Sequence, residues 1–181
     1  ELLKKYSKVY FLNENYVPAK LTPIDPAFLS EPARQLTLSA DVWPFMQKLL
    51  QSAKSNGVTI QVASAYRSFS EQSTLKASYK VIYGTGANKF SVDQGYSEHQ
   101  LGTTVDFTTP KIGGVLLGFD TTDAYIWLNN NAYKYGFIIS YPKENKYYQF
   151  EPWHWRFVGI ALATTLHDNG KLYYSLEQRI I

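Results

Sequence analysis

The sequence predicts an α+β fold in which a small antiparallel sheet is flanked by helices. Segments of helical and strand-like periodicity are interspersed along the chain, and the later strand-like segments follow closely on one another. This order favours an α+β arrangement over a doubly wound sheet. The composition, 45% hydrophobic and 16% aromatic in 181 residues, is sufficient for the core of one domain.

Prolines punctuate the first 35 residues, at positions 18, 23, 26 and 32. We interpret residues 1–35 as an N-terminal extended arm packed on the domain rather than as a linker. The reason is that apolar side chains in this stretch, such as Phe11, Leu12 and Val17, require burial. Residues 36–181 then form the domain itself.

The first predicted helix spans residues 39–56. Ser39 is the expected N-cap, Pro44 is tolerated only near the first turn, and Asn56-Gly57 ends the helix. Its apolar face is defined by spacings of three and four residues and contains Val42, Phe45, Met46, Leu49, Leu50 and Ala53. The next segment, VTIQVAS at 58–64, alternates like a half-buried strand.

The remaining elements are predicted by caps, stops and alternation. Residues 68–84 begin with serine caps and form a helix that ends at Gly84, and residues 84–96 form a loop. Strands are expected at 103–109, at 137–142 and within 147–159. Helices are expected over 121–136, with a threonine cap and a glycine stop, and over 160–170, which Asn169-Gly170 closes.

The charge and the cysteine content exclude several functions. The net charge of +3 is spread along the chain without a basic stripe, so we expect no nucleic-acid partner. The lack of cysteine excludes a disulfide scaffold, a cysteine-ligated zinc site and a cysteine nucleophile. No apolar run approaches the roughly 20 residues needed to span a bilayer, so we expect no membrane span.

The segment SEHQLGTTVDF, residues 97–107, contains one of the three histidines, His99, seven residues before Asp106. Side chains at this offset lie on opposite faces of a regular strand. The two residues can therefore share a metal only if the chain bends between them, and Gly102 is the expected position of the bend. Taken alone, such a pair is more often structural than part of a metal site.

The segment FEPWHW offers a further ligand, His154, three residues after Glu151. Pro152 lies between them and removes a ladder donor, which argues for irregular backbone at this point. Without cysteine, a zinc site needs His, Asp and Glu, and a catalytic site keeps three protein ligands and one open position. His167 instead fits a helix C-terminus, where an imidazolium interacts favourably with the helix dipole.

Three motifs give a more specific signal when they are considered together. SAYRSFSEQ, SEHQLGTTVDF and EPWHWRFVG occur in this order. They fit the patterns Ser-x-Tyr-Arg-Ser-x-x-x-Gln, Ser-x-His-x-x-Gly-x-x-x-Asp and Glu-x-Trp-His. In this they resemble the VanY-type D-alanyl-D-alanine carboxypeptidases, which belong to a group of zinc peptidases with lysostaphin and the Sonic hedgehog domain. The resemblance covers roughly residues 36–160 and implies the fold of that group.

The resemblance also implies a role for each matching position. His99, Asp106 and His154 would bind one zinc ion, Glu151 would be the catalytic base, and Arg67 would stabilise the oxyanion. Further substrate contacts would come from Gln72, Ser97, Trp153 and Tyr141. The implied reaction is hydrolysis of the terminal D-alanine from peptidoglycan stem peptides.

Two alternative functions fit the same motifs. An L,D-carboxypeptidase acting on tetrapeptide stems shares all of them. A non-catalytic cell-wall-binding module would keep the fold without the chemistry, and the presence of every catalytic residue argues against it. The substrate implies an extracytoplasmic protein of a bacterial cell envelope, with a cytoplasmic location left open. The chain begins without Met or a signal peptide, so we expect that an export signal or anchor has been removed, and we expect a monomer.

Overall fold

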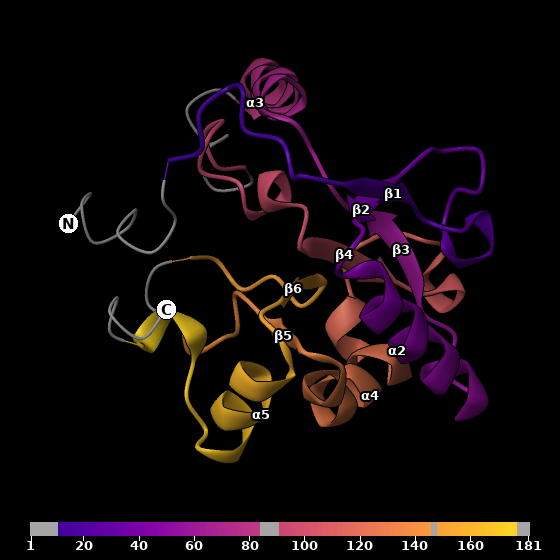
Figure 1. Cartoon of the computed structure of the whole chain (residues 1–181). Coiled ribbons are helices and arrows are strands. Elements are labelled where there is room, and N and C mark those ends of the chain that lie inside the picture. Colours follow the sequence, from indigo (N-terminus) through magenta and orange to yellow (C-terminus); the bar gives the residue numbers. More distant parts are fainter. Residues whose placement is uncertain (1–10, 84–90, 146–147, 177–181) are drawn as a thin grey trace.

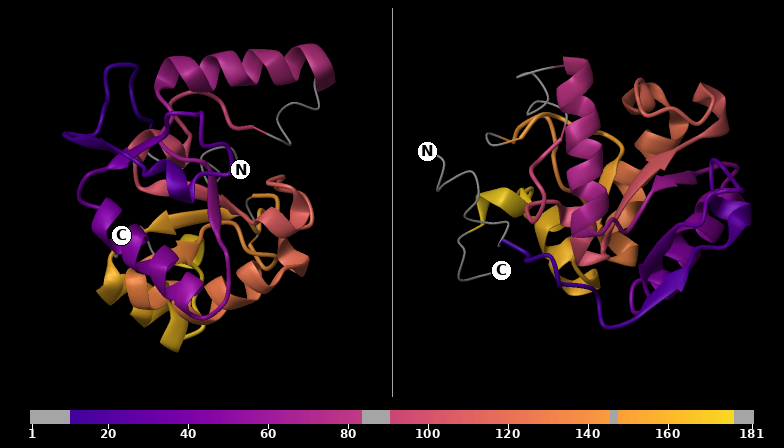
Figure 2. Two further views of the ribbon diagram at one scale, coloured as in Figure 1. Left: turned by 90° about the vertical axis from the view of Figure 1, so that its right-hand side faces the viewer. Right: turned by 90° about the horizontal axis from the view of Figure 1, so that it is seen from above.

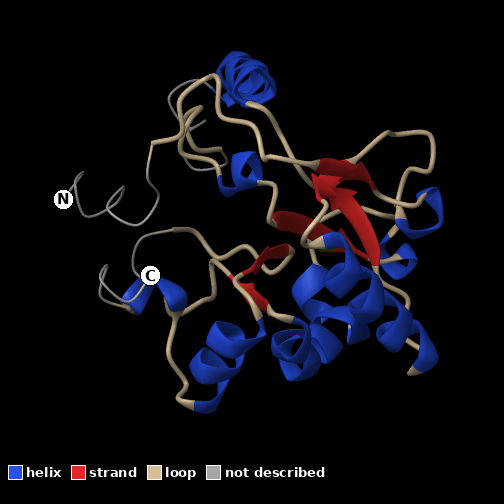
Figure 3. Cartoon of the chain, viewed as in Figure 1, coloured by secondary structure: helices blue, strands red, loops and turns tan. Residues whose placement is uncertain are grey.

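The computed structural model describes residues 11–83, 91–145 and 148–176, and its centre is a four-stranded antiparallel sheet (Figures 1 and 3). The strands are β3 (Gln61–Ser64), β4 (Thr104–Thr108), β5 (Phe137–Ile139) and β6 (His154–Phe157), in the order β3-β4-β6-β5. All five positions of β4 are buried, because this strand has a partner on each side. The predicted fold class is confirmed.

Helices lie on both sides of this sheet. α3 (Phe69–Tyr83) lies on one side, and α2 (Trp43–Ser55), α4 (Asp123–Asn131) and α5 (Ile160–Asp168) lie on the other, as Figures 1 and 2 show together. The core between α2, α4 and the sheet is apolar and includes Met46, Leu49, Leu128, Val62, Val105, Phe107 and Trp155. The buried residues of α3 are different, because they are the polar Gln72 and Lys76.

A second sheet pairs β1 (Leu21–Pro23) with β2 (Thr37–Ser39). Ile24 and Leu29, which lie in the predicted arm, are buried in the main core, so this part of the arm packs on the domain. Phe11 and Val17 are more than half exposed, contrary to expectation. The boundary at residue 35 stays a prediction, and residues 1–10 lie outside the described part of the chain.

The first helix begins later than expected, and Ser39 as its N-cap was wrong. Ser39 pairs with Leu21 as the last residue of β2, and its backbone N–H donates to the carbonyl of Gly102 at 2.9 Å. This pairing extends the chain at Ser39. α2 therefore begins at Trp43, with Val42 at the N-cap position and no side-chain cap, while Pro44 lies in the first turn as predicted.

The bounds of most other elements lie closer to those predicted from the sequence. Thr122 caps α4 as predicted, because its hydroxyl accepts from the backbone N–H of Tyr125 at 3.2 Å. α4 is shorter than expected, and the 3₁₀ turn η6 (Ala132–Tyr135) continues from it to Gly136. The predicted loop at 84–96 is described only from residue 91. No helix among the described residues has the length and apolarity to cross a bilayer.

Candidate metal centre and active site

A sharp turn at Gly102 brings His99 and Asp106 together. His99 lies in a 3₁₀ turn, η3 (Glu98–Leu101), and Gly102 ends this turn with a φ of 70° before β4 begins at Thr104. A positive φ of this size favours glycine. His99 Nε2 lies 3.3 Å from Asp106 Oδ2 as a result. The bend that the sequence predicted at this position is confirmed.

The register of the sheet adds the third residue. β4 and β6 pair so that Asp106 is opposite His154, and His154 Nδ1 lies 3.1 Å from Asp106 Oδ1. One ligand atom from each of His99, Asp106 and His154 lies within 4.8 Å of the others, and all three residues are buried. Two imidazoles and one carboxylate are a donor set that suits zinc, so the residues fit the metal that the sequence implied.

His99 is oriented by the end of β3. Its Nδ1 lies 2.7 Å from the backbone carbonyl of Ala65. Because a carbonyl only accepts, Nδ1 carries the proton and Nε2 is left to face Asp106. Burial lowers the pKa of His99, and the charge of Arg67 lowers it further against the opposing effect of Asp106. The neutral form that a metal requires is thereby favoured.

In His154 the two ring nitrogens have the opposite roles to those in His99. Its Nε2 donates to Oε2 of Glu98 at 2.9 Å, so Nδ1 faces Asp106 and Glu151. Burial lowers the pKa of His154, but its hydrogen bonds to Asp106 and Glu98 outweigh burial and raise that pKa to about 10. A cation between two carboxylates is thus electrostatically favoured at this point in the protein without metal.

Both buried carboxylates next to His154 are held ionised. Burial raises the pKa of Asp106, but His99 and His154 outweigh it and hold that pKa well below its usual range. Burial likewise raises the pKa of Glu98, but Arg156 and His154 hold it well below its usual range. Asp106 is therefore in the ionised form that a metal ligand requires.

Glu151 lies beside the three ligands, in the turn that leads into β6. The backbone N–H of His154 donates to the carbonyl of Glu151, and Glu151 Oε2 lies 3.6 Å from His154 Nδ1. This irregular backbone contains Pro152, as the sequence predicted. Burial, with help from the charges of Asp106 and Glu98, raises the pKa of Glu151 to about 7 against the effect of His154. A carboxyl group with this pKa is suited to accept and return a proton near neutral pH.

Arg67 lies in the connection between β3 and α3. It donates from Nη1 to Gln72 Oε1 at 2.6 Å and from Nη2 to Ser64 Oγ at 3.1 Å. Its backbone N–H donates to the carbonyl of His99 at 3.3 Å, which ties the connection to the metal centre. Arg67 also lines a cavity of about 740 Å³ between residues 34–37 and α3.

Gln72 is buried, and its side-chain amide is hydrogen-bonded to neighbouring residues. Besides accepting from Arg67, it donates from Nε2 to Ser91 Oγ at 2.9 Å and to the carbonyl of Val92 at 2.8 Å. One turn later on α3, Lys76 donates to the carbonyl of Ser91 and lies 3.4 Å from Asp93. α3 thereby holds the segment that leads to Ser97 and His99.

Three further residues of the implied substrate site differ in their surroundings. Ser97 is buried at the N-cap position of η3, and its hydroxyl makes no capping hydrogen bond. Trp153 is half-buried and packs against the main core. Tyr141 is buried, and its ring stacks on the imidazole of His154, with centroids 4.5 Å apart. Their contacts with substrate stay predictions.

The sequence did not point to Glu98, Arg156 and Tyr174. Arg156 Nη1 donates to Glu98 Oε1 at 2.8 Å, and the Tyr174 hydroxyl donates to the same oxygen at 2.5 Å. The one available signal was the acidic residue directly before His99. Its partners lie 58 and 76 positions away, where no spacing rule reaches.

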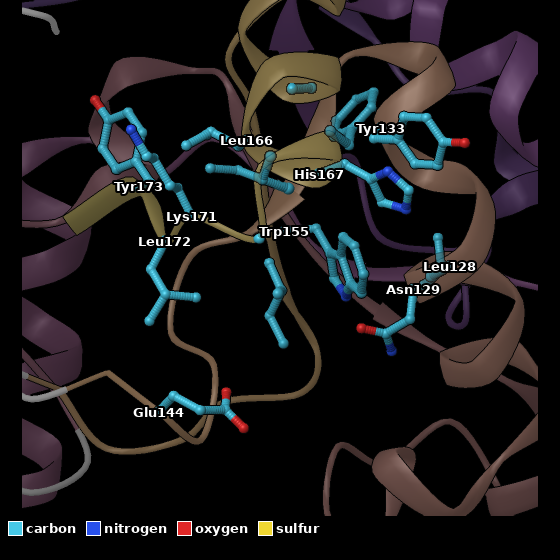
Figure 4. Close-up of a pocket in the computed structure, with 15 residues that line it drawn as sticks. Leu128, Asn129, Tyr133, Glu144, Trp155, Leu166, His167, Lys171, Leu172 and Tyr173 are labelled. Atoms are coloured by element: carbon cyan, nitrogen blue, oxygen red, sulfur yellow. The ribbon is translucent and has the colours of Figure 1, made fainter. Parts of the chain in front are cut away.

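A second cavity, of about 520 Å³, lies away from the metal centre (Figure 4). Trp155 lines it, and because successive strand residues face opposite ways, His154 faces the other side of β6. His167 also lines this cavity from the last turn of α5, and its ring stacks on Tyr133 with centroids 3.6 Å apart. Its exclusion from the ligand set agrees with this position.

The fold and the site together are typical of one class of protein. A buried His-Asp-His group, with a carboxylate at its edge and a guanidinium nearby, is the residue set of a metal-dependent hydrolase. A model of the VanY family, described as D-alanyl-D-alanine carboxypeptidase, matches residues 35–160. The chain belongs to this family.

Individual relatives agree with this assignment. The chain is 33% identical to YodJ of Bacillus subtilis (strain 168) over 174 residues, 93% of this chain and 64% of that protein. It thus spans less than two thirds of that relative's length. Among solved structures, the LdcB LD-carboxypeptidase is similar with a TM-score of 0.81 and 31% identity, over 91% of this chain and 80% of that one. The vancomycin resistance D,D-pentapeptidase VanY, as a variant in complex with Zn(II), has a TM-score of 0.69 and 28% identity, over 92% of this chain and 96% of that one.

Proposed function

We propose that the chain is a zinc-dependent carboxypeptidase that releases the terminal D-alanine from peptidoglycan stem peptides. The observation that carries this proposal is the buried group of His99, Asp106 and His154, with Glu151 Oε2 at 3.6 Å from His154 Nδ1. A zinc ion held there would polarise the scissile carbonyl and lower the pKa of a bound water. The Zn(II) complex of the related VanY supports the choice of metal.

Glu151 has the position and acidity of the proton carrier. It would accept a proton from the attacking water and return it to the amine of the departing D-alanine. A carboxyl group with a pKa of about 7 can do both near neutral pH. Since Pro152 keeps this residue out of the regular strand, its side chain lies at the edge of the ligand group and not within it.

Arg67 would stabilise the negative charge that develops on the carbonyl oxygen. Its guanidinium stays charged and is already oriented by Gln72 and Ser64, so little reorganisation is needed during the reaction. Gln72 would then act through Arg67. Ser97 would help to bind the terminal carboxylate of the substrate, as the family resemblance implies, with Trp153 and Tyr141 as walls beside the metal.

Two substrate preferences are supported by different relatives. The family description favours a D,D-carboxypeptidase, which removes D-alanine from the pentapeptide. The similarity to the LdcB LD-carboxypeptidase favours an L,D-carboxypeptidase, which acts on the tetrapeptide. Both reactions release D-alanine, so they differ in the residue before the scissile bond. We favour the D,D reaction and keep the L,D reaction as the alternative.

Product analysis by mass spectrometry tests the proposal. The protein is loaded with zinc and incubated separately with pentapeptide and tetrapeptide stems. Conversion of pentapeptide to tetrapeptide supports the D,D reaction, and conversion of tetrapeptide to tripeptide supports the L,D reaction. Binding of both peptides without cleavage would instead support a non-catalytic wall-binding module. Peptidoglycan as the substrate would place the protein outside the cytoplasm, in the bacterial cell envelope.

A further inference from the structure

We infer that Glu98 is a positioning residue for the metal, which fixes the imidazole of His154 in the orientation that presents Nδ1 to the ion. The inference rests on the ligand set given under the proposed function. Glu98 precedes the ligand His99 directly in the chain, yet its carboxylate contacts the other histidine, His154, 56 positions away. One short turn thus supplies a ligand and also the support of a second ligand.

The two oxygens of the Glu98 carboxylate have different partners. Oε2 accepts from His154 Nε2 at 2.9 Å, while Oε1 accepts from Arg156 and from Tyr174. A carboxylate can only accept, so Glu98 holds a proton on Nε2 of His154, and Nδ1, which faces Asp106, is the nitrogen left for the metal. Support of this kind orients a metal-binding histidine and raises its basicity as a ligand.

The surroundings of Glu98 are built to keep its charge in place. Its side chain is fully buried, and an unpaired carboxylate would be very unfavourable there. Arg156 provides the compensating charge from the same face of β6 as His154, two residues further on. The guanidinium of Arg156 lies 4.8 Å from the ring centroid of Tyr173, so the aromatic C-terminal segment covers this ion pair.

The two histidine ligands are therefore supported differently. His99 has a backbone carbonyl, that of Ala65, which no substitution can remove. His154 is supported by the side chain of Glu98, which can be substituted while all three ligands are kept. Glu98→Gln is the informative variant because its amide offers one acceptor oxygen and one donor group. It can satisfy either His154 or the Arg156–Tyr174 pair, but not both.

Zinc affinity, measured by competition with a chelator, tests the inference. We expect Glu98→Gln to weaken zinc binding by about 10- to 100-fold. We also expect it to change the visible absorption spectrum of the cobalt-substituted protein, which reports ligand geometry. Glu98→Asp keeps the charge and should recover part of the affinity. Tyr174→Phe removes one contact to Oε1 but leaves the bond to His154, and it should stay within a few-fold of wild type.

A loss of zinc through general instability is distinguished by Leu128→Ala. Leu128 is a fully buried core residue beside the second cavity, so its truncation lowers the melting temperature without touching the ligands. Wild-type zinc affinity and an unchanged cobalt spectrum in Glu98→Gln would overturn the inference. If His154→Ala also kept its zinc, the ligand set itself would fail, which is a separate outcome.

A measurement on the unsubstituted protein covers the case in which Glu98→Gln does not fold. In protein loaded with ¹¹³Cd and labelled with ¹⁵N at histidine, we expect metal coupling to Nδ1 of one ligand histidine and to Nε2 of the other. The signals are assigned with the variant His167→Asn. Coupling of both ligand histidines through Nε2 would contradict the role of Glu98, because that nitrogen of His154 could not then donate to the carboxylate.

Discussion

Arg67 and Gln72 form a hydrogen bond of 2.6 Å between the guanidinium Nη1 and the amide Oε1, five residues apart across the start of α3. The amide nitrogen of Gln72 is used at the same time by Ser91 and Val92. Gln72 therefore connects the guanidinium to the segment before His99. This gives Gln72 a role in the proposed reaction that does not require contact with substrate.

Truncation of Gln72 should lower catalysis and leave the metal in place. We expect Gln72→Ala to reduce kcat/KM by up to about 100-fold, because Arg67 loses the acceptor that orients it. Zinc content, measured by elemental analysis, should be unchanged.

Lys76→Met is the matched control for Gln72→Ala. It removes another buried tie from α3 to Ser91 but leaves the bond between Arg67 and Gln72 intact. If both variants lose activity equally, Gln72 serves to hold the 91–93 segment, and orientation of Arg67 is not its main role.

Replacement of Glu151 should separate catalysis from metal binding. We expect Glu151→Ala to abolish hydrolysis, and the shape-matched Glu151→Gln to lose about 10²- to 10⁴-fold in kcat, because neither side chain can accept the proton of the water. Zinc should be retained in both. Glu144→Gln, which changes an exposed carboxylate of the preceding loop, should behave as wild type. Substantial activity in Glu151→Ala would exclude the proposed mechanism.

The two histidines His154 and His167 provide a matched pair for the ligand assignment. His154→Ala removes one of three ligands and should lose zinc. His167→Ala removes an exposed ring that stacks on Tyr133 away from the metal centre. This variant should keep one full equivalent of zinc. Elemental analysis after gel filtration distinguishes the two results. Full zinc occupancy in His154→Ala would remove that residue from the ligand set.

The family resemblance of the three motifs predicted that His99, Asp106 and His154 lie together, and they do. Backbone breakers in both segments allow this convergence. Gly102 and Pro152 interrupt regular strands at the positions where the side chains must converge, and both interruptions are present. The partners of Glu98 could not be predicted in the same way. Their contacts depend on how β6 and the C-terminal turn pack against η3, which no local periodicity records.

The fold shows the same division between local and long-range information. The fold class and the principal helices and strands followed from periodicity and caps. Ser39 was misassigned because its backbone pairs with Leu21 and Gly102, and these partners lie far from it in the sequence. A serine before an apolar helical pattern is a good N-cap only where such pairing does not extend the chain.

The carboxylate of Glu71, at the start of α3, is expected to stabilise the fold in a pH-dependent way. Its carboxylate accepts from the hydroxyl and the backbone N–H of Ser68, at 2.6 and 2.7 Å, and these bonds lower its pKa from the ordinary value of 4.5. A carboxyl group whose pKa is lower in the folded protein stabilises the fold at every pH above its pKa in the unfolded chain. This stabilisation is lost as the pH falls through the pKa of the folded protein.

We therefore expect Glu71→Gln to lower the melting temperature at neutral pH, with a difference from wild type that shrinks and is lost as the pH falls from 4.5 through the lower pKa of folded Glu71. In a Ser68→Ala background, where only the backbone bond remains, the difference at neutral pH should be smaller. A difference that stays constant with pH would show that the charge of Glu71 is not responsible.

Gly102 should be less replaceable than other glycines with a positive φ. A Cβ at this position would meet Cγ of Pro18 at 2.7 Å, in addition to the strain of a φ of 70°. Gly57 has a φ of 76° and no heavy atom within 4 Å of such a Cβ, so Gly57→Ala measures the strain alone. That strain should cost about 1 to 2 kcal/mol in the free energy of unfolding.

Gly102→Ala should cost more than this, because either Pro18 or the turn must move. Any movement of the turn shifts His99 relative to Asp106, so zinc affinity should fall in Gly102→Ala and stay unchanged in Gly57→Ala. Urea denaturation and chelator competition measure the two effects separately. Equal stability losses and equal zinc affinities in the two variants would mean that the close contact with Pro18 does not fix the turn, and that the position of His99 is set by its bond to Ala65 instead.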